Sequence, residues 1–247
     1  MPATFIDGTG HRGETDYEFS ILTKYFTVSE AAIPSAERSA REQLEASLAS
    51  YSREERMDIG MMQYLSHSAS FHREFPLRLR YGFLIQLYAL MEERAKSLSR
   101  VIIERDHQQC KGLGEHYPQG FMNAFEKWVS TNSSGQSTRW QDGENLRVIR
   151  NCIVHANGRV SGDKKPQKVR ETLEKLEGAE EDRFGFISVK ASCCTNICEQ
   201  IRALFNDIYQ STGFGSSFFL SSREPTAILI DTSGDIPRFS TPDLEET

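Results

Sequence analysis

Apolar residues recur at three- and four-residue spacing along much of the chain, which is the period of a helix with one buried face. The longest such stretch runs from Leu77 to Ile103 and predicts one long helix. The same spacing from Cys194 to Ile208 predicts a second long helix near the end of the chain. The stripe of the first helix is expected to hold Leu84, Leu87, Tyr88, Met91, Ala95, Leu98 and Ile102.

Shorter helices are expected between turn-forming sequences. Residues 36–73 are predicted to be helical with a break near Ser52, and residues 121–129 are predicted to form a short helix. Residues 166–177 are predicted as a helix because Pro166 stands at a first-turn position and Gly178 at a C-terminal one. Only residues 226–230, TAILI, have the pattern of a strand.

These elements predict an all-α chain, and the short connections favour an antiparallel up-and-down helical bundle. We expect an N-terminal helical extension over residues 1–74 and the bundle over residues 75–210. A short irregular C-terminal tail would follow over residues 211–247 and hold the one expected strand.

The composition favours a folded domain that does not enter a membrane. Hydrophobic residues make up 38% of the 247 residues, which can support a core. No run approaches the roughly 18 apolar residues that a membrane span requires, and the first ten residues lack the pattern of a signal peptide. The five cysteines form no regular framework, so reduced thiols and a cytoplasmic location are expected.

Charge is unevenly distributed along the chain, although the net charge of −6 argues against bulk binding of nucleic acid. Residues 1–58 carry eleven acids against six bases, and residues 223–247 carry six against two. From Arg147 to Arg170 there are four Arg and three Lys against the single Asp163. This stretch can form a basic patch or an ordinary solvated face, and the sequence leaves both open.

The segment LRVIRNCIVHANG, residues 146–158, carries the most informative chemistry. Asp142 is a candidate N-cap for a helix over residues 144–156, which would stop at Asn157-Gly158. Within it, the side chains that should face the core are those of Leu146, Ile149, Cys152, Ile153 and Ala156.

The opposite side of that helix is polar with one exception. Asn151 and His155 lie about 40° apart there, whereas Arg150 lies at the edge of the core stripe, about 140° from His155. Val148 lies about 20° from His155. An apolar, β-branched residue at this position predicts that the polar side is covered, by another part of the chain or by a second subunit.

The arrangement RNCIVH resembles the Arg, polar residue, short spacer, His signature of the HEPN (higher eukaryotes and prokaryotes nucleotide-binding) superfamily. The segment GFLIQLYALMEERAKSLSRVI is similar to the long first helix of many such domains, and GFISVKASCCTNICEQIRALFNDIY is similar to their closing helix. The resemblance covers residues 75–210. It implies a HEPN-type helical bundle that forms a homodimer, with the motif helices near the two-fold axis and one composite active site.

The resemblance also implies a metal-independent endoribonuclease that acts by 2′-hydroxyl attack and uses no cofactor. His155 would be the general acid and base, Arg150 would stabilise the phosphate, and Asn151 would position the reacting groups. By helical geometry Glu92 lies at the border of its helix stripe, so its carboxylate either orients Arg150 or His155 or is an ordinary solvated charge. Further RNA-binding candidates in the basic stretch are Arg147, Arg159, Lys164 and Lys165.

Family analogy places such enzymes in bacterial stress response, toxin–antitoxin systems or antiphage defence, with RNA as substrate and an antitoxin or defence-system protein as partner. Each residue also has a structural alternative. His155 could interact with the free carbonyl groups of the last helical turn, and Arg150 could form an ordinary interhelical ion pair. A non-catalytic helical interaction module that binds a partner protein or a nucleotide therefore stands as the alternative function.

Weaker signals point to other sites. Gly8, Gly10 and Gly13 match the GxGxxG pattern of dinucleotide-binding loops, but no strand pattern of the required kind surrounds them. The closely spaced Cys193, Cys194 and Cys198 are expected to be small buried residues. The five-residue spacing of His67 and His72 is poor for two metal ligands on one helical face, so no metal site is expected.

Overall fold

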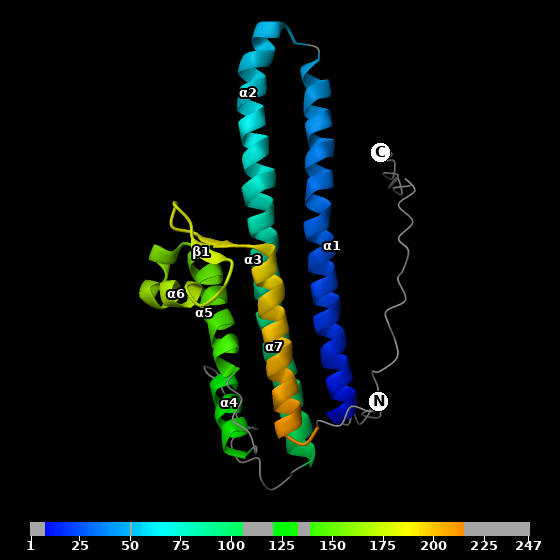
Figure 1. The fold of residues 1–247 in the computed structure, drawn as a ribbon, viewed down its shortest axis with the longest axis vertical. Coiled ribbons are helices and arrows are strands. Elements are labelled where there is room, and N and C mark those ends of the chain that lie inside the picture. The colour runs from blue at the N-terminus through cyan, green and yellow to red at the C-terminus, as the bar shows by residue number, and fades with distance from the viewer. Residues whose placement is uncertain (1–7, 50, 106–120, 133–138, 215–247) are drawn as a thin grey trace, which may run out of the picture. The chain divides into compact units, whose positions relative to one another are not determined.

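The computed structural model describes residues 8–49, 51–105, 121–132 and 139–214, all of which belong to the first of two units, Met1–Ser216 and Ser217–Thr247. The described part is mostly helical (Figure 1), which confirms the all-α class. The HEPN type of the bundle stays a prediction. In chain order the elements are α1 Gly8–Leu48, α2 Arg53–Ala69, a π-helical turn η1 Ser70–Glu74, α3 Phe75–Arg105, α4 Phe121–Asn132, α5 Trp140–Ala156, a 3₁₀ turn η2 Val160–Gly162, α6 Pro166–Leu173, β1 Ala179–Glu181, β2 Ile187–Val189 and α7 Ala191–Ser211.

Helix α3 is the centre of the described bundle. It packs against α1, α4, α5 and α7, and all seven residues of its predicted stripe, from Leu84 to Ile102, are buried. The predicted helix over residues 77–103 is thereby confirmed, with two further residues at each end. In Figure 1 α2, η1 and α3 follow one another as one long helical rod. Pro76, which has no N–H to donate, follows the π-helical turn, and such a widened turn accommodates the lost hydrogen bond.

Helix α1 was predicted only in part and lies within the segment expected to be an N-terminal extension. Its first half contributes the fully buried Phe19 and Phe26 to the core, so it belongs to the packed bundle. Gly8, Gly10 and Gly13 lie within the first turns of this helix and not in a loop after a strand. These glycines therefore do not form the loop after a strand that a dinucleotide-binding site requires.

The break predicted near Ser52 is confirmed, because α1 ends at Leu48 and α2 begins at Arg53. Ser52 caps α2 with a capping box: its Oγ accepts a hydrogen bond from the Glu55 N–H, and its own N–H donates to Glu55 Oε2 at 3.0 Å. This capping box stabilises the first turn of α2. None of the residues of α2 is buried, so burial of a side chain does not fix where the helix begins.

Two helix boundaries were predicted incorrectly, and one pair of strands was not predicted. Helix α5 begins at Trp140, so Asp142 lies in its first turn and is not its N-cap. Helix α6 begins at Pro166 as predicted but ends at Leu173, and the chain reaches Gly178 through turns. The antiparallel pair β1 and β2 was not predicted, since strands of three residues carry too short a pattern. The predicted strand over residues 226–230 lies outside the described residues.

Helix α7 confirms the closing helix and places its thiols inside the bundle. Cys193, Cys194 and Cys198 are buried, and burial raises the pKa of each thiol, that of Cys193 to about 11. They fill space as small apolar side chains, as expected. None of the described helices combines the length and apolarity needed to cross a membrane.

Candidate functional site

Helix α5 carries the Arg-to-His segment and ends where the sequence predicted. Asn157 adopts the left-handed conformation at φ 51°, and Gly158 follows at φ 76°. A Cβ atom at Gly158 would lie 2.2 Å from the hydroxyl oxygen of Tyr81, so only glycine fits. That hydroxyl group donates a hydrogen bond to the carbonyl oxygen of Ile187 at 2.6 Å.

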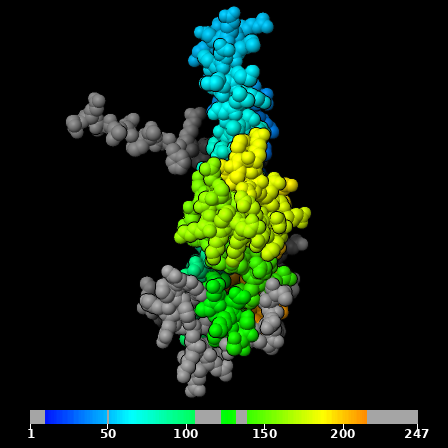
Figure 2. Space-filling model, turned by 90° about the vertical axis from the view of Figure 1, so that its left-hand side faces the viewer, coloured from blue at the N-terminus to red at the C-terminus, as the bar shows by residue number. Residues whose placement is uncertain are grey.

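The chain after α5 is fixed to the β1–β2 hairpin by backbone hydrogen bonds. The N–H of Val160 donates to Gly185 O at 2.9 Å, and the N–H of Ile187 donates to Gly158 O at 2.8 Å. The connection through η2 then folds back beside α5, and α6 follows it. In Figure 2 the residues from α4 to β2, coloured green to yellow, gather on one face.

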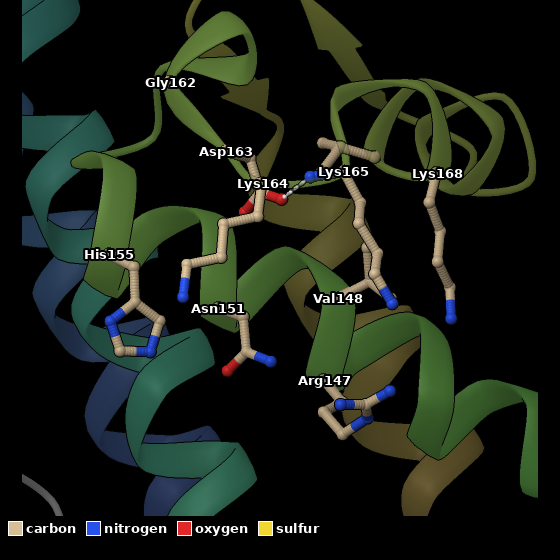
Figure 3. Close-up of a pocket in the computed structure, with 10 residues that line it drawn as sticks. Arg147, Val148, Asn151, His155, Gly162, Asp163, Lys164, Lys165 and Lys168 are labelled. Atoms are coloured by element: carbon tan, nitrogen blue, oxygen red, sulfur yellow. Dashed lines mark hydrogen bonds between the residues drawn. The ribbon is translucent and has the colours of Figure 1, made fainter.

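A pocket of about 490 Å³ lies between α5 and this returning segment. Side chains of four kinds line it: a histidine and an asparagine from α5, four cations, one acid, and two valines (Figure 3). The lining residues are Arg147, Val148, Asn151, His155, Gly162, Asp163, Lys164, Lys165, Lys168 and Val169. We call this the basic pocket.

Val148 shows what covers the polar side of α5. It is only 8% exposed, and Val169 of α6, which lines the same pocket, is 1% exposed. Helix α6 packs against α5. The predicted cover is therefore present over Val148 and comes from the same chain, whereas His155 on the same side of α5 stays exposed.

Two of the four cations, Arg147 and Lys168, share one acid. Glu144 accepts hydrogen bonds from Arg147 Nε at 2.6 Å and from Lys168 Nζ at 2.6 Å. Burial favours the neutral carboxyl group, but the bonds from Arg147 and Lys168 outweigh it and hold the pKa of Glu144 below its usual value. The bond to Glu144 likewise raises the pKa of Arg147.

The other two cations, Lys164 and Lys165, are exposed and have no ion-pair partner among the described residues. The N–H of Lys165 donates to Asp163 Oδ1 at 2.7 Å, which holds the backbone of this turn. In Figure 3 the side chain of Lys164 extends toward Asn151 and His155. The charge available to an anion in the basic pocket is therefore mainly that of these two lysines.

Arg150 does not line the basic pocket. Its Nη1 donates to Asn151 Oδ1 at 2.8 Å, and its guanidinium group lies over the ring of Tyr88 on α3, 5.2 Å from the ring centre. Asn151 thus joins Arg150 on one side to the basic pocket on the other. Of the three predicted catalytic residues, the structure brings Asn151 and His155 into one pocket and leaves Arg150 behind Asn151.

Glu92 and Arg159 also lie outside the basic pocket. Glu92 forms an ion pair with Lys96 at 3.3 Å. Glu92 and Arg150 act in opposite directions on Tyr88: burial raises the pKa of its hydroxyl group, Glu92 raises it further, and Arg150 lowers it. The guanidinium group of Arg159 lies over the ring of Phe186 instead, 5.4 Å from its centre.

Sequence reasoning did not single out Lys168, Val169 or Glu144. Lys168 was counted only as one of the cations of the basic stretch. The role of Glu144 follows only from the fold, because α6 must return beside α5 before Lys168 can reach it. Among the described residues, no group of three or more His, Cys, Asp or Glu side chains is placed to hold a metal ion.

Comparison of the chain with protein-family models, with curated proteins and with solved structures finds no match.

Proposed function

We propose that the chain is a metal-independent endoribonuclease of HEPN type that cuts RNA at the basic pocket. The observation that carries this proposal is that His155 and Asn151 line one pocket together with Lys164, Lys165 and Arg147. A phosphodiester needs both kinds of group for cleavage. An imidazole can accept and return a proton, while nearby cations stabilise charge on phosphoryl oxygens.

In the proposed reaction His155 removes the proton from the ribose 2′-hydroxyl group while that oxygen attacks the adjacent phosphorus. The bond from phosphorus to the 5′ oxygen breaks, and the imidazolium group returns the proton to that oxygen. The products are one fragment ending in a 2′,3′-cyclic phosphate and one beginning with a 5′-hydroxyl group. Such proton transfer contributes typically about 10²–10⁴-fold to the rate.

The cations divide this work in the proposal. Lys164 and Lys165 bind the phosphate, since their charges are exposed and unpaired within the described residues. Arg147 adds a weaker contribution because Glu144 holds its guanidinium group. Arg150 acts through Asn151: its hydrogen bond occupies the amide oxygen, which directs the Asn151 NH₂ group, a donor, toward the pocket.

The alternative is that the basic pocket binds a phosphate group without cutting it, as an interaction module would. The position of Arg150 favours this alternative, because the predicted phosphate stabiliser lies outside the pocket of one chain.

Incubation of the purified chain with tRNA or total RNA in EDTA tests the proposal. Wild-type protein should give fragments with 2′,3′-cyclic phosphate ends, and His155→Ala should lower the cleavage rate at least about a hundredfold. Because His155 is exposed, its removal should leave the thermal midpoint almost unchanged. His72→Ala is the matched control, since His72 is an exposed histidine that pairs with Glu37 and does not line the pocket.

The two functions predict different results in the same experiment. Absence of fragments, together with retained binding of a labelled oligonucleotide, would support the interaction module. Cutting that survives in His155→Ala would rule out the proposed chemistry.

A further inference from the structure

A groove runs between α1 and α3, which lie side by side in the bundle (Figure 1). Its larger part has a volume of about 580 Å³, and a smaller part of about 170 Å³ continues it, because Tyr25 and Gln86 line both. All of its lining residues belong to these two helices, from residues 18–26 of α1 and 78–93 of α3. We call this the α1–α3 groove.

The wall of the groove on α1 is apolar and faces solvent. Ile21 and Tyr25 line it, and Tyr17 and Val28 extend the same stripe by one turn at each end. These four side chains lie within about 80° of one another around the helix, and each is at least 50% exposed. Because a solvated helix normally has polar residues on its outer side, this stripe indicates a surface that a further element covers.

The side of the groove on α3 has room for a helix. Its residues Gly82 and Ala89 are small and stand about two turns apart, and a Cβ atom at Gly82 would meet nothing within 4 Å. Small side chains allow two helix axes to approach closely. From Arg78 to Glu93 the groove is about 22 Å long at 1.5 Å per residue, the length of about four helical turns.

Charge is confined to the ends of the groove. Of the described residues that line it, only Glu18, Arg78 and Glu93 are charged, and Glu18 and Glu93 stand together at one end. Arg94 forms ion pairs there with Glu18 at 2.9 Å, with Glu14 at 3.0 Å and with Glu93 at 3.6 Å. Three carboxylates around one guanidinium group leave an excess of two negative charges.

Neighbouring cations do not cancel this excess. On α3, Lys96 pairs with Glu92 at 3.3 Å, and Arg100 lies two turns beyond the acids, about 10 Å further along the helix. On α1, Arg12 donates a hydrogen bond to Asn206 of α7. The groove therefore combines an apolar centre with one acidic end.

We propose that the α1–α3 groove binds an amphipathic helix of another protein, about four turns long, with an apolar stripe that ends in Lys or Arg side chains. A helix that lays its apolar face into a groove between two helices is a recurring form of peptide recognition. Basic side chains at one end of that helix would meet the excess of carboxylates, which fixes its direction in the groove.

This surface is separate from the basic pocket, since no residue lines both. The proposal therefore does not depend on the proposed function. Occupation of the α1–α3 groove should leave the basic pocket open.

Fluorescence anisotropy of the full chain with a labelled synthetic peptide tests the proposal. The peptide is an amphipathic helix of about 18 residues with leucines at three- and four-residue spacing and two lysines at one end. It should bind the wild type in a saturable manner with a Kd below about 100 µM. A second peptide with glutamates in place of the lysines should bind at least about tenfold more weakly.

A substitution in the apolar wall tests the place of binding. Ile21→Gln should weaken binding of the basic peptide at least about tenfold, because the peptide then covers a polar group in place of a half-exposed apolar side chain. Met57→Gln is the matched control, since Met57 is an exposed apolar residue of α2 outside the groove. It should leave the Kd unchanged.

A charge reversal tests the acidic end. Glu93→Lys removes the excess of two negative charges, so it should weaken binding of the basic peptide at least about tenfold and strengthen binding of the acidic one. Glu199→Lys, at an exposed acid of α7 outside the groove, makes the same change in net charge and should alter neither Kd.

Three results would overturn the proposal. The first is absence of saturable binding of the basic peptide by the wild type. The second is an equal effect of each substitution and its control, which would indicate binding elsewhere. The third is a doubled mass of the full chain in sedimentation velocity that Ile21→Gln abolishes, which would assign the groove to a second copy of this chain.

Discussion

Arg150 and Asn151 are neighbours in the sequence, and Arg150 Nη1 donates a hydrogen bond to Asn151 Oδ1 at 2.8 Å. Adjacent residues of a helix point about 100° apart, so the long arginine side chain must bend toward the amide. The ring of Tyr88 supports the guanidinium group in this position. Arg150 therefore contacts Asn151, which lines the basic pocket, and does not line the pocket itself.

This arrangement predicts that Arg150 and Asn151 act as one unit. Arg150→Ala and Asn151→Ala should each lower kcat for RNA cleavage about tenfold, and the double variant should be no worse than about the more damaging single one. KM should change little, because the charges proposed to bind the RNA phosphate are those of Lys164 and Lys165, which both variants keep. Steady-state kinetics of the three variants measure this coupling. Fully additive losses would mean that the two side chains act independently.

Lys164 and Lys165 should control affinity for RNA. Lys164→Ala and Lys165→Ala should each weaken binding and reduce the slope of log K against log salt by about 0.7, the value for one phosphate contact on a single strand. Fluorescence anisotropy with a labelled oligonucleotide over a salt series gives this slope.

Lys175→Ala serves as the control for the lysine variants, since Lys175 is exposed and does not line the basic pocket. It should leave the slope unchanged. Equal effects of all three substitutions would indicate bulk charge and not a pocket.

Gly158 should be intolerant of any side chain. In Gly158→Ala the new Cβ meets the Tyr81 hydroxyl oxygen and the backbone keeps a positive φ, so the free energy of unfolding should fall by at least about 2 kcal/mol. Gly82→Ala is the matched control, because a Cβ atom added at this position on α3 would meet nothing within 4 Å. That change should raise the free energy of unfolding by about 0.5–1 kcal/mol. Urea unfolding of both variants measures the difference.

His11 should make the bundle less stable as the pH falls. It is buried on α1 and its Nδ1 lies 2.7 Å from the Tyr209 hydroxyl oxygen. Burial, assisted by Arg94, lowers its pKa to about 4 from 6.5, so the unfolded chain binds a proton between these values and the folded chain does not. Stability from this residue is fully present above about pH 6.5 and is lost progressively toward about pH 4, by roughly 3 kcal/mol in total.

Urea unfolding at several pH values in this window should show a smaller pH dependence in His11→Gln than in the wild type. His72→Ala, at an exposed histidine, should keep the wild-type dependence. An unchanged profile in His11→Gln would contradict the assignment of this proton to His11.

Strong periodicity made α3, α7 and the end of α5 predictable, since local residues determine a stripe and a glycine cap. Helix α1 was harder because its buried face begins with His11 and Thr15 before Phe19 and Phe26, while Tyr17, Ile21 and Tyr25 are exposed on other sides. Apolar residues on several sides, with polar ones inside, blur the helical period. The buried polar pair makes sense only beside Tyr209, which is far away in the sequence.

The part of the basic pocket that lies on α5 was predictable from the sequence, and the part contributed by other elements was not. Periodicity placed Asn151 and His155 on one side of α5, and the apolar Val148 among them correctly indicated a cover. The direction of the Arg150 side chain could not be predicted, because it depends on the position of Tyr88 on α3. Helical spacing within α5 does not determine where α3 lies. The identity of the cover required knowing that α6 returns beside α5.

The attachment of the segment after α5 has a consequence for the energetics of ligand capture. Hydrogen bonds to Gly185 and Ile187 and the Asp163 turn fix the backbone that carries the two exposed lysines before any ligand arrives. An incoming anion therefore orders only flexible ammonium groups and no loop, so little conformational entropy opposes its capture. Encounter with the anion should then be fast, because it does not wait for a slow rearrangement of the polypeptide.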